Sequence, residues 1–61
     1  ININTASKEE LQYLQGIGPT TADKIIQYRQ KQPFRTTEEI MEVDGIGPKT
    51  YEQIELKIKV K

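Results

Sequence analysis

The tetrapeptide Gly-Ile-Gly-Pro occurs twice in this sequence, at residues 16–19 and again 29 residues later, at 45–48. Glycine after an apolar run ends a helix, because glycine adopts the positive φ that a helix terminus often requires. Proline suits the first position of the next helix, where its missing N–H costs nothing. Each copy therefore predicts a hairpin between two helices, with backbone N–H groups that suit a phosphate.

The repeat extends beyond the two hairpins. When residues 14–25 are aligned with 43–54, six of the twelve positions are identical. Each half predicts helix, hairpin and helix, and one half alone has too little apolar surface to fold. We therefore expect an all-α, compact, pseudo-two-fold domain of four to five short helices in which the halves pack together. It comprises a first motif at about 8–31, a linker at 32–36 and a second motif at about 37–57 of one domain, 1–61.

Helix limits follow from capping residues and proline. Ser7 and Thr36 each precede a Glu-Glu pair, which predicts a capping box at the start of both halves. The first helix should end at Gly16, and the next should run from about Pro19 to about Lys31, before the Gln-Pro pair that stops it. The apolar spacing predicts a core formed by Ile3, Leu11, Leu14, Ile17, Ala22, Ile25, Ile26, Phe34, Ile40, Val43, Ile46, Tyr51, Ile54, Leu56 and Ile58. The other tyrosines, Tyr13 and Tyr28, are expected in the core or at its rim.

Composition excludes several classes of function. The 61 residues include neither Cys nor His, so thiolate metal sites, disulfides and the usual neutral-pH base are absent. The hairpins lack the third glycine of a dinucleotide fingerprint and the Gly-Lys-Ser/Thr of a P-loop. No apolar run approaches the roughly 20 residues of a membrane span. We expect no enzyme and no small-molecule substrate, and any membrane anchor would lie outside these residues.

The spacing of apolar and small residues resembles the helix-hairpin-helix motif of DNA-binding proteins. The first copy fills every fixed position of that motif, and the second copy departs at Tyr51, in place of Ala, and at Glu55, in place of an apolar residue. Nearly the whole chain is similar to the soluble domain of ComEA-type bacterial competence proteins, including the lead-in at 3–7 and the Pro33-Phe34 linker.

This resemblance implies binding of double-stranded DNA without sequence preference, during DNA uptake in natural competence. It also implies a place outside the cytoplasmic membrane, with other competence proteins as further partners. The implied DNA-binding residues are Gly16, Ile17, Gly18, Thr20, Thr21, Gly45, Ile46, Gly47, Lys49 and Thr50. Two positions at which the family often has basic residues are occupied by Thr21 and Gln53.

The residues themselves support a phosphate site at each hairpin. A helix N-terminus offers unpaired N–H groups and roughly half a positive charge, and glycine allows close approach. Lys24 and Lys49 are each placed to add a contact, although Lys24 could instead pair with a nearby carboxylate. Thr21 and Thr50 could likewise be solvated first-turn residues. If about four phosphates were neutralised, log K would change with log salt with a slope of about −3.6.

Alternatives stay open at this point. Nine basic and nine acidic residues give zero net charge, whereas nucleic-acid binders are usually basic. The double motif also resembles an extrinsic photosystem II subunit that binds protein. It could equally be an accessory domain of a DNA repair or processing enzyme such as a nuclease, helicase or ligase. No cofactor is expected, although hairpin carbonyls in related motifs can hold a monovalent cation.

Overall fold

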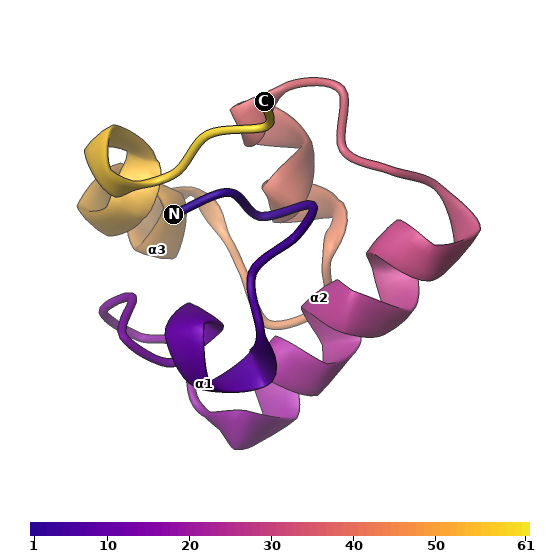
Figure 1. Ribbon diagram of the computed structural model, residues 1–61. Helices are drawn as coiled ribbons and strands as arrows, with labels where there is room; N and C mark the ends of the chain where they lie inside the picture. The colour runs from indigo at the N-terminus through magenta and orange to yellow at the C-terminus, as the bar shows by residue number, and fades with distance from the viewer.

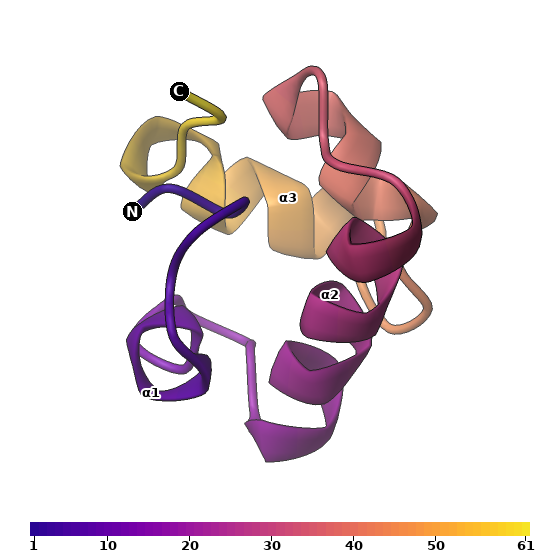
Figure 2. The same ribbon diagram turned by 45° about the vertical axis from the view of Figure 1, so that its right-hand side comes forward.

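A computed structural model describes all residues, 1–61. It contains three α-helices and two 3-10 segments, α1 (Lys8–Leu11), α2 (Pro19–Lys31), η1 (Thr37–Glu42), α3 (Pro48–Ile54) and η2 (Glu55–Lys57). The first half of the chain, with α1 and α2, lies below the second half, with η1 and α3, in both ribbon views (Figures 1 and 2). The predicted all-α tandem arrangement is confirmed.

The first half begins with the predicted capping box, but its first helix is shorter than expected. The Ser7 hydroxyl accepts from the Glu10 N–H at 3.1 Å, and the Glu10 carboxylate accepts from the Ser7 N–H at 2.9 Å, so the capping box is present. The α-helix nevertheless ends at Leu11, well before Gly16. Bonds between residues three apart, such as Leu14 N–H to Leu11 C=O at 3.1 Å, replace helical bonds there and turn the chain earlier than expected.

The second half departs from the predicted mirror image. Thr36 makes no side-chain cap, and the Glu39 carboxylate accepts from the Arg35 N–H at 2.6 Å instead, so the second capping box is wrong. The following segment is 3-10 rather than α. Tyr51 occupies the place of the small Ala22, and its hydroxyl lies 3.0 Å from Thr37 Oγ1. That contact has no counterpart in the first half, so the two halves pack differently outside their hairpins.

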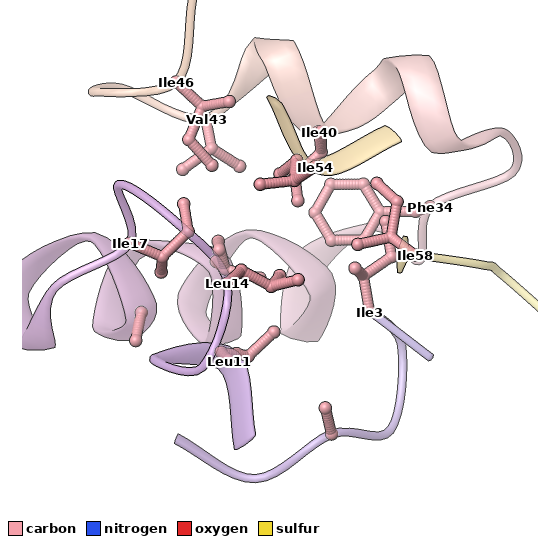
Figure 3. Packing of buried hydrophobic residues seen from close by; sticks show 13 residues of the cluster. Ile3, Leu11, Leu14, Ile17, Phe34, Ile40, Val43, Ile46, Ile54 and Ile58 are labelled. Atoms are coloured by element: carbon pink, nitrogen blue, oxygen red, sulfur yellow. The ribbon is translucent and has the colours of Figure 1, made fainter. Parts of the chain in front are cut away.

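Thirteen buried apolar side chains from both halves form one core (Figure 3). Ile3, Phe34 and Ile58 close one end of it, and the Phe34 ring stacks on Tyr28 with centroids 4.9 Å apart. Two expectations were wrong, because Leu56 is 96% exposed and Tyr13 is 79% exposed. Leu56 follows the buried Ile54 by two residues, about 200° around a helix, so it projects from the opposite side.

The two ends of the chain are joined across the core. The Ile3 N–H donates to the Lys59 carbonyl, and the Lys59 N–H donates to the Ile1 carbonyl, both at 2.9 Å. The Asn4 amide links this clasp to the linker, since it bonds to both the N–H and the C=O of Phe34 and to the carbonyl of Val60. Figure 1 shows both termini on the same side of the molecule. The hairpins lie away from this clasp and are held by the core.

Candidate functional site

Both hairpins contain the same four-residue turn. The Ile17 N–H donates to the Leu14 carbonyl at 3.1 Å, and the Ile46 N–H donates to the Val43 carbonyl at the same distance. The third residue of each turn is glycine with positive φ, at +85° in the first turn and +100° in the second. A side chain would be strained in that conformation, so the first glycine of each Gly-Ile-Gly is needed for its backbone.

The isoleucines between the glycines serve the fold. Ile17 and Ile46 are buried, and Figure 3 shows them on facing sides of the gap between the hairpins, with Val43 beside Ile46. Their N–H groups, which the resemblance placed at a phosphate, are already engaged in the turns. Both isoleucine side chains lie in the core, as predicted, and their N–H groups are not free for an anion in this structure.

The second glycine of each hairpin leaves the helix entrance open. Gly18 and Gly47 are the capping residues of α2 and α3, with ordinary φ values of −94° and −100°. A Cβ added at either position would meet no atom within 4 Å. The N–H groups that have no acceptor here are those of Gly18, Thr20, Thr21, Gly47, Lys49 and Thr50. Each entrance thus presents free donors that an anion could reach without meeting a side chain.

Each hairpin touches the start of the other half's second helix. A Cβ on Gly16 would lie 3.4 Å from Thr50 Cγ2, and a Cβ on Gly45 would lie 3.4 Å from Thr21 Oγ1. The two contacts are related by the 29-residue offset. Thr21 and Thr50, predicted as phosphate contacts or solvated residues, therefore face the opposite hairpin. The spacing of residues within one motif does not indicate that its threonine lies against the other motif's hairpin.

The charges around the hairpins are balanced rather than uniformly positive. Lys24 pairs with Asp44 at 3.0 Å, so the alternative prediction that it would pair with a nearby carboxylate is confirmed. Lys49 is exposed and makes no ion pair. Asp44 lies in the second hairpin, where the first hairpin has Gln15. Asp44 was not among the predicted site residues, although the alignment of the two hairpins places it directly before Gly45. Lys49 is consequently the one unpaired cationic side chain among the predicted site residues.

Features that could form another kind of site are few in this structure. No group of three or more acidic, His or Cys side chains is arranged to hold a metal ion. None of the helices has the length and apolar character needed to cross a membrane. A shallow groove between α2 and the second hairpin has a mixed lining of Lys24, Gln27, Tyr28, Lys31, Glu42, Val43 and Asp44. The repeated hairpins remain the feature in which backbone geometry and free donors coincide.

Two Gly-Ile-Gly turns, each opening an α-helix and each sealed by a buried isoleucine, define a tandem helix-hairpin-helix domain. Comparison with known families agrees: residues 1–59 match the family described as "Helix-hairpin-helix motif", and the chain belongs to that family. The predicted family is thus confirmed.

Individual relatives show the same similarity. The chain is 50% identical over 62 residues to "ComE operon protein 1" of Bacillus subtilis, covering all of this chain and 30% of that protein. It is 47% identical over 55 residues to an uncharacterized protein of Haemophilus influenzae, covering 87% of this chain and 49% of that one. It is 38% identical over 61 residues to human "Endonuclease/exonuclease/phosphatase family domain-containing protein 1", covering 98% of this chain and 11% of that protein. The chain therefore spans half or less of each of these relatives.

Proposed function

We propose that the two hairpins hold the phosphate backbone of double-stranded DNA, one hairpin on each strand. The observation that carries this proposal is the duplicated open helix entrance, at Gly18 and at Gly47, with three free N–H groups at each. N–H donors and the positive end of the helix dipole favour an anion there. Two such entrances related by a pseudo-two-fold match the approximate two-fold symmetry of a duplex.

Binding of this kind would not read the base sequence. The proposed contacts are backbone N–H groups and the ammonium of Lys49, all of which suit phosphate oxygens. The isoleucines between the glycines turn into the core, so they offer no side chain to a base. The domain would accordingly serve as a binding module without catalytic activity and without a small-molecule substrate.

We further propose that this binding serves DNA uptake in natural competence, on the outer side of the cytoplasmic membrane. The similarity to a protein encoded in a ComE operon supports this setting. In this proposal the full protein is membrane-anchored through residues outside those described here, and other competence proteins are possible partners.

Protein binding is the second candidate, and one observation favours it. The chain has zero net charge, and Lys24, one of the two lysines near the hairpins, is paired with Asp44. A domain of this fold could then bind a segment of another protein through the same entrances. A third setting, as an accessory domain of a DNA-processing enzyme, is supported by the similarity to the human protein.

Titration of a labelled duplex with the domain, followed by fluorescence anisotropy at several salt concentrations, tests the proposal. With Lys49 as the one free cation, the slope of log K against log salt should be about −0.9, and about −1.8 if Lys24 also contacts a phosphate. Duplexes of different sequence should bind alike. Comparing potassium with sodium salts tests for a cation held by the hairpin carbonyls. Absence of binding at about 50 mM salt would refute the DNA proposal and favour the protein-binding alternative.

A further inference from the structure

Each hairpin lies against a threonine from the opposite half, which the duplicated sequence alone does not reveal. Thr50, in α3, lies against Gly16 of the first hairpin, and Thr21, in α2, lies against Gly45 of the second. Both threonines are half-buried, whereas their neighbours Thr20 and Lys49 are exposed. Each threonine side chain therefore occupies the space between one helix entrance and the opposite turn.

We propose that the side chains of Thr21 and Thr50 position the two hairpins by fixing their separation, rather than contacting phosphate. This inference rests on the proposed function, since separation matters only if both hairpins bind one duplex. It assigns a task to two side chains that the resemblance placed among the DNA-binding residues. Their backbone N–H groups stay free for the phosphate, while their side chains act on the opposite hairpin.

In both contacts a threonine branch lies against the first glycine of the opposite hairpin. A Cβ at Gly16 would approach Thr50 Cγ2 to 3.4 Å, the shortest contact at that position, and Thr21 Oγ1 has the same role at Gly45. The first glycine of each hairpin is needed for the positive φ of the turn, and the threonine branch lies at van der Waals distance from the place of its missing Cβ. A β-branched side chain suits this place, since its χ1 is restricted in a helix and its branches are held in one orientation.

Fixed spacing would strengthen binding through the second contact. Once one hairpin holds a strand, the second hairpin binds at an effective concentration set by how closely its position matches the other strand. Removing the threonine branches would leave a gap at each contact and widen the range of separations. The affinity of each hairpin for phosphate would stay the same, while the gain from engaging both would fall.

Two double variants separate positioning from direct contact. Thr21→Val with Thr50→Val retains both branches but removes the hydroxyl groups, whereas Thr21→Ala with Thr50→Ala removes the branches as well. We expect the valine pair to bind duplex DNA within about twofold of the wild-type chain, and the alanine pair to bind roughly fivefold more weakly. Equal losses in both pairs would show that the hydroxyl groups bind phosphate, and an alanine pair that binds like the wild type would show no positioning role.

The same threonine variants made in a chain with one hairpin disabled distinguish positioning from a general effect on folding. Gly47→Val places a side chain in the second entrance, and its φ of −100° allows valine. With one hairpin engaged, separation no longer matters, so the alanine pair should cause no further loss in this background. A full fivefold loss there would overturn the positioning role.

Circular dichroism at the assay temperature must show the same helix content in every variant. The same measurements separate this inference from the proposed function. If the wild-type chain binds no duplex, the proposed function fails. If it binds and the valine and alanine pairs behave alike, DNA binding stands and the positioning role fails.

Discussion

Asp44 is the residue whose replacement most directly tests how charge acts at the hairpins. It lies immediately before Gly45 in the second turn, its side chain is 90% exposed, and it holds Lys24 at 3.0 Å. The first hairpin has Gln15 at the corresponding position. Asp44→Gln therefore makes residues 44–48 identical to residues 15–19, removes a negative charge from the proposed phosphate site and releases Lys24.

The size of the effect follows from two contributions. A carboxylate about 7 Å from a phosphate in water repels it by roughly 0.6 kcal/mol, so removing it should raise the affinity about threefold. Lys24, once released, can add one phosphate contact, which would steepen the salt slope from about −0.9 to about −1.8. Together they should raise the affinity roughly tenfold at low salt. The gain should shrink toward physiological salt, where the Debye length is about 8 Å.

The assay is the duplex titration at several salt concentrations, with Glu38→Gln as the matched control. Glu38 is an exposed residue near the start of η1, at the other end of that segment from the second hairpin, and its replacement changes the net charge by the same amount. The unfolding free energy should change by less than about 1 kcal/mol in the Asp44 variant, because the ion pair is exposed. If both variants bind equally well and with equal salt slopes, charge at the second hairpin does not act on the ligand.

Further variants test the hairpin entrances, the hydrogen bonds of Asn4 and the exposure of Leu56. Gly18→Val and Gly47→Val should each weaken duplex binding while helix content stays unchanged in circular dichroism, because neither glycine has positive φ and both entrances have room for a side chain; full affinity in the double variant would remove the entrances from the mechanism. Asn4→Ala should lower the unfolding free energy by about 2 kcal/mol and the Tm by about 10 °C, because three backbone groups lose their hydrogen-bond partner. A Tm within about 2 °C of that of the wild type would show that these bonds do not stabilise the joined chain ends. Leu56→Lys should change stability by less than about 0.5 kcal/mol in a urea titration, and a loss of several kcal/mol would mean that this leucine is buried after all.

Features that depend on local chemistry were predictable from the sequence. Gly-Ile-Gly-Pro requires a turn with positive φ at its first glycine and a helix starting at its proline, and both copies have these features. The helix from Pro19 to Lys31 has the expected bounds, since proline marks its start and the Gln-Pro pair follows its end. The buried positions of the first motif follow the helical period, apart from half-buried Ile26.

Local hydrogen-bond choices, the facing of the last turn and contacts between the halves were not predictable in this way. Thr36 has the residue type of a helix cap, yet the Glu39 carboxylate bonds to the Arg35 N–H instead. Leu56 follows an apolar pattern but lies on the outer side of η2. For the candidate site, the duplication located the hairpins and their open glycines. The contacts of Thr21 and Thr50 with the opposite hairpins depend on how the two halves are placed, which the sequence does not show.

The balance of geometry and charge has a consequence for how binding should depend on salt. Phosphate contacts made by ammonium groups release counterions and weaken as salt rises, whereas hydrogen bonds from backbone N–H groups release few. The six free N–H groups of the two helix entrances outnumber the one free lysine there. A neutral domain built in this way should bind weakly at low salt compared with a basic one, but retain a larger share of its affinity at high salt. Zero net charge is then consistent with the DNA proposal, because the positive potential is confined to two helix entrances.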